Sequence, residues 1–170
     1  LRRGEVRKPR RRQRQRERDG QQHGGQLLAS KLPLQVAQRL RALNATFLPR
    51  GLRIVPMRYM KNRVLLYLYR PERLKCDLAD SAAQDILRES GYPCACAENC
   101  LCRLITRLRA EGEFHHEVGL FLGYPPEDVR GFIENHAAGC KLMGCWKVYG
   151  DVDAAKERFA SFERCTRACM

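Results

Sequence analysis

Apolar residues at helical spacing open the part of the chain that is predicted to fold. They recur three or four positions apart, which places them on one side of a helix: Leu32, Val36, Leu40, Leu43 and Phe47. Pro49 and Gly51 follow, and both residue types favour the end of a helix. The pattern therefore predicts a helix from about residue 32 to residue 47.

Two strands are predicted next. Residues 52–57 form a short apolar run, and Pro56 within it favours the edge of a sheet because proline has no N–H to donate. Residues 59–62 suit a hairpin connection. Residues 63–70 contain the densest apolar run of the chain, from Val64 to Tyr69, which is typical of a central strand covered on both faces.

Helical spacing dominates the rest of the chain. Pro71 ends the second strand, residues 146–149 read as a third strand, and helices are predicted over 77–90, 98–110, 114–123, from Pro125 to about 135, and from Asp151 or Asp153 onward. We therefore predict an α+β fold in which a small three-stranded, largely antiparallel sheet, with residues 63–70 at its centre, is packed by about six helices.

The first residues differ in composition from everything that follows. Residues 1–26 are rich in Arg, Gln and Gly, and only Leu1 and Val6 among them are large and apolar. Such a segment cannot bury enough surface to offset its chain entropy. We predict a disordered Arg-rich arm over residues 1–26 and a single α+β domain over residues 27–170.

Charge is distributed unevenly along the 170 residues, whose formal net charge is +13. Residues 1–24 carry a net +7, residues 25–75 carry +10, and residues 76–170 carry −4. This asymmetry points to an acidic partner or to nonspecific nucleic-acid binding through residues 1–75. The arm contains no aromatic residue for base stacking, and a solvated tail is the simpler interpretation of the arm itself.

No apolar run approaches the roughly 20 residues of a membrane span, and the basic start is not followed by the apolar stretch of a signal peptide. We therefore expect a cytoplasmic protein without a membrane partner.

In a reducing compartment its nine cysteines are expected to be free thiols. The C-x-x-C knuckle of zinc sites is absent, but two C-x-C pairs could ligate a soft metal, with these candidates: Cys94, Cys96, Cys100, Cys102, Cys140 and Cys145.

Two segments carry a longer motif. Residues 114–135 read FHHEVGLFLGYPPEDVRGFIEN, and residues 144–150 read GCWKVYG. They resemble an uncharacterised bacterial domain-of-unknown-function family, DUF3793-like, whose pattern runs approximately FPHEIG, GYP, DV, GFI and WKVY. That pattern falls here on His116, Glu117, Gly119, Gly123, Tyr124, Pro125, Asp128, Val129, Gly131, Phe132, Trp146, Lys147 and Tyr149.

The resemblance is specific over about residues 112–165 and looser back to residue 32. It departs from the family pattern at His115, where the family has proline, and in the arm. It implies a cytoplasmic protein, common in anaerobic Gram-positive bacteria, that has no assigned activity. The residues themselves require no cofactor, since neither glycine-rich nucleotide-binding pattern is present.

The adjacent pair His116 and Glu117 is the candidate for catalysis, since a histidine beside a carboxylate can transfer protons or ligate a metal. The zinc-protease pattern fails because residue 120 is leucine. The structural alternative is a histidine at a helix start, with Glu117 stabilised by the helix dipole.

Alternation along the predicted third strand places Lys147 and Tyr149 on one face and Trp146 in the core. Lys147 and Tyr149 are candidates to hold an anion or a flat ligand, although a solvated sheet face is the alternative. Tyr124 and Asp128 join this candidate set from the Gly-Tyr-Pro-Pro-Glu-Asp segment, which chiefly starts a helix.

These residues favour a small cytoplasmic binding or accessory protein over an enzyme, with a polar pocket near His116 and Lys147. Two alternatives stay open. One is a thiol- or metal-handling protein, or an enzyme that uses His116 and Glu117. The other is nucleic-acid binding through the basic N-terminal half.

Overall fold

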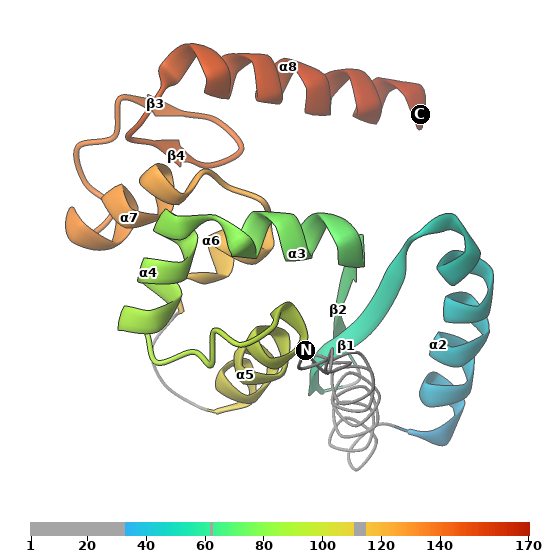
Figure 1. Cartoon of the computed structure of the whole chain (residues 1–170). Coiled ribbons are helices and arrows are strands. Elements are labelled where there is room, and N and C mark those ends of the chain that lie inside the picture. The colour runs from blue at the N-terminus through green and yellow to red at the C-terminus, as the bar shows by residue number, and fades with distance from the viewer. Residues whose placement is uncertain (1–32, 62, 111–114) are drawn as a thin grey trace, which may run out of the picture. The chain divides into compact units, whose positions relative to one another are not determined.

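Contacts along the chain divide it into two units in the computed structural model, which describes residues 33–61, 63–110 and 115–170 (Figure 1). Unit 1 runs up to Arg70 and adds Ala95–Arg109, and unit 2 combines Pro71–Cys94 with Ala110–Met170. The predicted arm, residues 1–26, lies outside the described residues. The single domain over residues 27–170 stays a prediction.

Unit 1 is built from the helix and hairpin that the hydrophobic pattern predicts, together with one later helix. Gly51 adopts the left-handed conformation, with φ of 69°, and turns the chain from the first helix into the hairpin. The elements are α2 (Leu34–Phe47), the 3-10 helix η1 (Leu48–Arg50), β1 (Arg53–Met60), β2 (Arg63–Tyr69) and α5 (Ala97–Arg109).

Strand β1 is held on its outer side by side chains of the two helices. The Asn44 amide in α2 donates to the Ile54 carbonyl at 2.8 Å and accepts from the Ile54 N–H at 2.9 Å. Arg109 of α5 donates to the Met57 carbonyl at 3.2 Å. Buried apolar residues of α2, β1 and α5 form the core of this unit: Leu40, Ile54, Val55, Met57, Leu101, Leu104 and Ile105.

The predicted three-stranded sheet is wrong, because the described strands form two separate antiparallel pairs, β1 with β2 and a short pair in unit 2. Strand β2 is also not covered on both faces, since Leu65, Leu66 and Leu68 are 46%, 42% and 53% exposed. An apolar run specifies extended structure, but it does not specify how many strands pair with it or what covers it.

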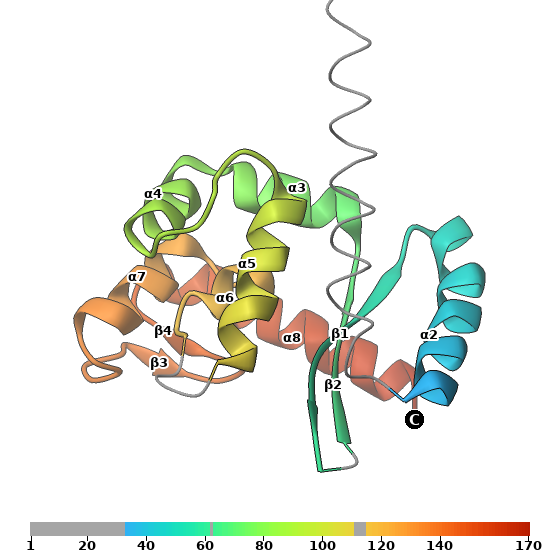
Figure 2. The same ribbon diagram turned by 90° about the horizontal axis from the view of Figure 1, so that it is seen from below.

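Unit 2 is mainly helical (Figure 2). The structure has two helices between Pro71 and Glu89 where one was predicted from residue 77, since Pro71 starts a helix instead of only ending the strand. The elements are α3 (Pro71–Ala79), α4 (Ser81–Glu89), α6 (Val118–Phe121), α7 (Pro126–Glu134), β3 (Leu142–Met143), β4 (Lys147–Val148) and α8 (Val152–Ala168).

Two groups of buried apolar residues contribute to the core of unit 2. Helices α3 and α4 bury Leu74, Leu78 and Leu87, while the β3–β4 hairpin and α8 bury a cluster of Trp146, Val148 and Ala155. Phe162, Cys165 and Thr166 of α8 are exposed, although the Phe162 ring lies edge-on to Trp146 at 6.3 Å between centroids. None of the described helices is both long enough and apolar enough to cross a membrane.

Asp80 caps α4, with its carboxylate accepting from the N–H groups of Ala82 at 2.9 Å and Ala83 at 3.1 Å. We expect Asp80→Ala to lower the free energy of unfolding by about 1 kcal/mol, because these two N–H groups lose their acceptor. Asp80→Asn keeps the acceptor and should cost much less. Urea denaturation of both variants measures the difference, and equal losses would contradict the capping role.

Candidate functional site

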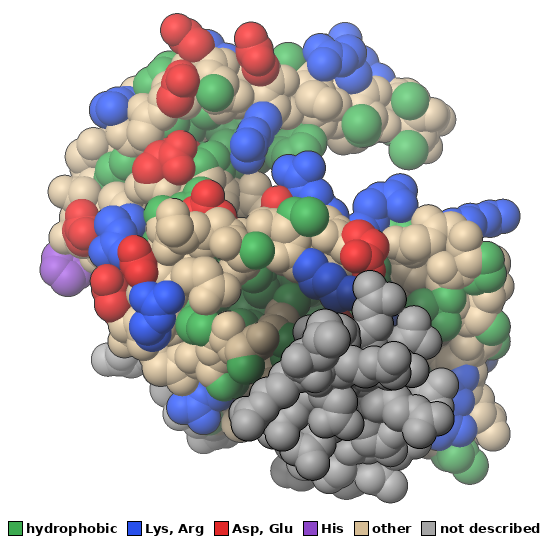
Figure 3. All heavy atoms as spheres, in the orientation of Figure 1, with side chains coloured by type: hydrophobic (Ala, Val, Ile, Leu, Met, Phe, Trp, Pro, Cys, Tyr) green, Lys and Arg blue, Asp and Glu red, His purple; other side chains and the backbone are tan. Residues whose placement is uncertain are grey.

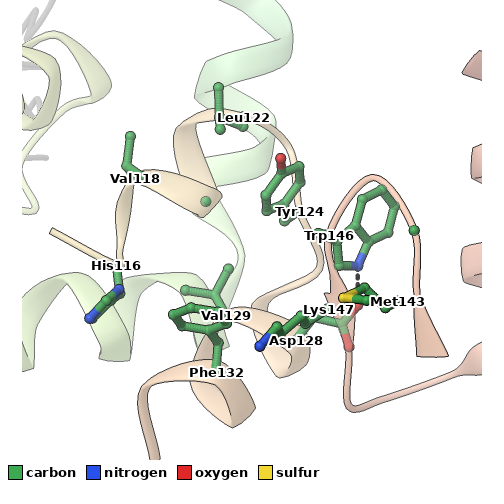
Figure 4. A pocket seen from close by; sticks show the side chains of 12 residues that line it. His116, Val118, Leu122, Tyr124, Asp128, Val129, Phe132, Met143, Trp146 and Lys147 are labelled. Carbon is green, nitrogen blue, oxygen red and sulfur yellow. Dashed lines mark hydrogen bonds between the residues drawn. The ribbon is translucent and has the colours of Figure 1, made fainter. Parts of the chain in front are cut away.

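A hollow of about 360 Å³ lies within unit 2, between α6, α7 and the β3–β4 hairpin (Figure 4). It has the size of a small-molecule site. Most of its lining is apolar or aromatic, and the lining residues are His116, Val118, Gly119, Leu122, Tyr124, Asp128, Val129, Phe132, Met143, Gly144, Trp146 and Lys147.

The Gly-Tyr-Pro-Pro segment shapes one end of the hollow. Gly123 has a φ of 77° and ends α6 with a sharp turn that brings Tyr124 beneath Gly119. A Cβ at Gly119 would lie 2.9 Å from Val129 and 3.1 Å from Tyr124, so only glycine allows this close approach. The prediction that this segment is chiefly structural agrees with these contacts.

Asp128 joins α7 to the wall of the hollow. Its carboxylate is only 3% exposed and accepts three hydrogen bonds, from Trp146 Nε1 at 2.7 Å, the Tyr149 N–H at 2.7 Å and the Gly150 N–H at 2.8 Å. Charge-assisted bonds of this kind are among the stronger ones in proteins. Asp128 therefore lies in the hollow, as predicted for a ligand-binding candidate, but its oxygens hold the hairpin in place.

Aromatic rings line the hollow beside Asp128. The rings of Tyr124 and Trp146 are stacked at 5.0 Å between centroids, and Phe159 packs edge-on against Trp146 at 4.5 Å. Trp146 is buried, as the strand alternation predicts. Burial raises the pKa of the Tyr124 hydroxyl, with a smaller contribution from Cys145, so this group stays neutral at ordinary pH.

Lys147 and His116 lie on the two sides of Phe132 in the close view (Figure 4). Lys147 Nζ donates to the Ala137 carbonyl at 2.6 Å and stands 5.9 Å from the Phe132 ring centroid. The His116 ring is tilted against Phe132 at 5.0 Å between centroids. The structure thus brings His116 and Lys147 to one hollow, which is the juxtaposition that the sequence predicts.

Glu117 and Tyr149 are not brought to the hollow. Glu117 is buried, accepts from the Tyr92 hydroxyl at 2.8 Å, and lies 3.7 Å from Nδ1 of His115. The neighbouring residues His116 and Glu117 therefore point to different surroundings. The catalytic pairing of His116 with Glu117 stays a prediction.

Tyr149 packs against α7 instead, where a Cβ at Gly131 would lie 2.5 Å from the tyrosine Cβ. Its hydroxyl is buried and has no hydrogen-bond partner among the described residues. Burial raises the pKa of this hydroxyl, with a smaller contribution from Cys140. Tyr149 was predicted to share a face with Lys147, but only Lys147 lines the hollow.

None of the nine cysteines, all of which lie in the described ranges, forms a disulfide in the structure. Within the described ranges no three His, Cys, Asp or Glu side chains are grouped to hold a metal ion. Burial raises the pKa of Cys102, and Cys96 and Glu98 raise it further, which lowers the thiolate fraction that metals and electrophiles require. Cys94, Cys100, Cys140 and Cys145 do not line the hollow either.

Several lining residues were not predicted as part of the site. Phe132 lies within the helix predicted from Pro125 to about residue 135, and its place in the family motif could have marked it as a site residue. Met143 lies in β3, a two-residue strand that the sequence pattern did not reveal, and it is 73% exposed at the hollow. Short strands of this kind carry too few residues for a periodic signal.

A family model described as "Protein of unknown function (DUF3793)" matches residues 24–170. The match confirms the resemblance read from residues 114–135 and 144–150 and extends it over unit 2 and the described part of unit 1. Neither a curated protein nor a solved structure matches the chain.

Removing the Asp128 carboxylate should be costly, because it leaves a buried indole N–H and two backbone N–H groups without their acceptor. We expect Asp128→Ala to lower the free energy of unfolding by roughly 3 kcal/mol. Glu127→Ala removes an exposed carboxylate from the same helical turn and should cost less than about 1 kcal/mol. Fluorescence of Trp146, the single tryptophan, reports urea unfolding of both variants, and comparable losses would refute this role.

Proposed function

We propose, from the premise that the chain belongs to the DUF3793 family of proteins of unknown function, that it binds a small, flat, largely apolar molecule bearing one anionic group. The ligand would occupy the hollow between α6, α7 and the β3–β4 hairpin. The observation that carries this proposal is the placement of Lys147 and His116 on the two sides of Phe132 in a hollow whose lining is mostly apolar or aromatic.

Size and lining support a small aromatic ligand. Sites for small molecules have volumes of roughly 300–1,000 Å³ and are lined by apolar and aromatic side chains with a few polar groups. The rings of Tyr124, Phe132 and Trp146 provide flat surfaces on which an aromatic ring can stack. Exposed Leu122 and Met143 add apolar surface at the hollow, which a ligand would shield from water.

The charges support an anionic group on that ligand. The Asp128 carboxylate already accepts from three N–H donors, which stabilise its charge and hold it toward the hairpin. Lys147 donates to a neutral carbonyl and has further N–H donors that an anion can accept from. A carboxylate or similar group would therefore be placed beside Lys147.

Binding is favoured over catalysis by the chemistry of the lining. No cysteine or serine is among the residues that line the hollow, and the Glu117 carboxylate faces Tyr92 and His115. These features supply a shaped cavity with one ammonium group and favour binding over proton transfer.

The test compares 2-naphthoate with its neutral amide, 2-naphthamide, by calorimetry and by quenching of Trp146 fluorescence. We expect the wild-type chain to bind the acid more tightly. Lys147→Met should weaken binding of the acid by about tenfold or more, as expected for the loss of a partly buried charge partner, and should leave the amide nearly unaffected.

Lys141→Met is the matched control. Lys141 also donates to a backbone carbonyl, that of Gly150 at 3.0 Å, but it is exposed and does not line the hollow. It should bind both compounds as the wild type does. Equal affinity of the wild-type chain for acid and amide, or the same loss in both lysine variants, would exclude the proposed site.

A further inference from the structure

Unit 1 has an unbalanced positive charge. Residues 33–70 contain no aspartate or glutamate, and Glu98 is the only acidic residue among the described residues of the unit. The described residues of unit 1 carry ten arginines and one lysine: Arg39, Arg41, Arg50, Arg53, Arg58, Lys61, Arg63, Arg70, Arg103, Arg107 and Arg109. In Figure 3 the surface around α2 shows blue and green side chains and no red ones.

In unit 2, unlike residues 33–70, acidic and basic side chains pair with one another. Its acidic residues form ion pairs with neighbours on the same helix, such as Arg73 with Asp77, Lys156 with Asp153 and Arg167 with Glu163. Ion pairs of this spacing are common on helix surfaces. Residues 33–70 contain no carboxylate to pair with the cations there, although Arg70 donates to the Arg50 carbonyl and Arg53 is hydrogen-bonded to Tyr69. The exposed cations of this segment can therefore bind an external polyanion.

The β1–β2 hairpin gives this charge a defined shape. It is a two-stranded antiparallel ribbon of eight and seven residues, with a bulge between Pro56 and Arg58. Next to its turn lie exposed Lys61 and Arg63, together with Tyr59 and Met60, which are 38% and 43% exposed. The end of the ribbon therefore combines positive charge with apolar side chains.

We propose that the β1–β2 hairpin binds duplex DNA in a groove, independently of the ligand site in unit 2. A two-stranded ribbon fits the major groove of B-form DNA, which is about 12 Å wide. Lys61, Arg63 and the arginines along the ribbon contact phosphates, and Tyr59 and Met60 contact the bases. In the major groove, apolar side chains can contact the methyl group of thymine.

Two features favour a nucleic acid over other polyanions. Ten of the eleven cations in the described part of unit 1 are arginine, whose planar group binds phosphate through two parallel hydrogen bonds and stacks on bases. The cations also occur on both strands of the ribbon and on α2, as a groove with a phosphate chain on each side requires. The exposed leucines of β2 would instead favour an anionic bilayer or an acidic amphipathic peptide, and the test includes both.

The experiment uses the full chain and measures fluorescence anisotropy of a labelled 25-base-pair DNA duplex over a range of salt concentrations. Lys61→Glu combined with Arg63→Glu should weaken binding by tenfold or more near 0.1 M salt. It should also lower the slope of log K against log salt by about 2, because each phosphate contact contributes about 0.9. Met60→Ala should weaken binding severalfold with no change of slope.

Lys156→Glu combined with Arg164→Glu is the matched control, since it makes the same change of charge at exposed positions of α8. Residues 1–32 are present in every variant, so their contribution cancels in the comparison. The control should bind within about threefold of the wild type, and duplex RNA, whose major groove is too narrow for a ribbon, should bind more weakly than DNA.

Three results would overturn the proposal. The first is an equal loss in the two double variants, which would show a response to net charge alone. The second is no binding of the wild-type chain to DNA near 0.1 M salt. The third is tighter binding to vesicles containing anionic lipid, or to a polyglutamate peptide, that is abolished by Leu66→Ser combined with Leu68→Ser. Circular dichroism confirms that each variant is folded.

Discussion

The arrangement of the C-terminal hairpin depends on one buried carboxylate. Asp128 lies in the first turn of α7, where its charge is also stabilised by the helix dipole, and it reaches across to the hairpin, where it binds the Trp146 indole and the backbone at Tyr149 and Gly150. These bonds fix the position of Trp146, which forms part of the hollow, and of the residues just before α8. A helix start, an aromatic wall and the last turn before α8 are thereby connected through a single side chain.

Local signals in the sequence predict much of the fold. The apolar spacing in residues 32–47 gives α2, the run at Val64–Tyr69 gives β2, and Pro125–Pro126 gives the start of α7. Pairing between strands is different, because it depends on contacts between distant residues that no local pattern records. The sequence therefore did not distinguish one three-stranded sheet from two separate hairpins, and it did not reveal β3, which has only two residues.

The candidate site was likewise predictable only in part. The juxtaposition of His116 and Lys147 followed from their places in two segments of one family motif, and the structure brings both to one hollow. The directions of Glu117 and Tyr149 did not follow from the sequence. Glu117 lies in the turn before α6, and Tyr149 lies beyond the end of β4, so neither residue follows a helix or strand period. Glu117 meets Tyr92, which lies 25 positions away, and no pattern around residue 117 indicates that partner.

The Asn44 side chain has a consequence for self-association. A sheet of two strands has two edges, and each edge offers N–H and C=O groups to strands of other molecules. On β1 the Ile54 groups are already taken by the Asn44 amide, which imitates a neighbouring strand over one residue, and the Met57 carbonyl is taken by Arg109. The outer edge of β1 is therefore blocked against strand addition by side chains alone, so a two-stranded ribbon can remain small without a third strand to protect that edge.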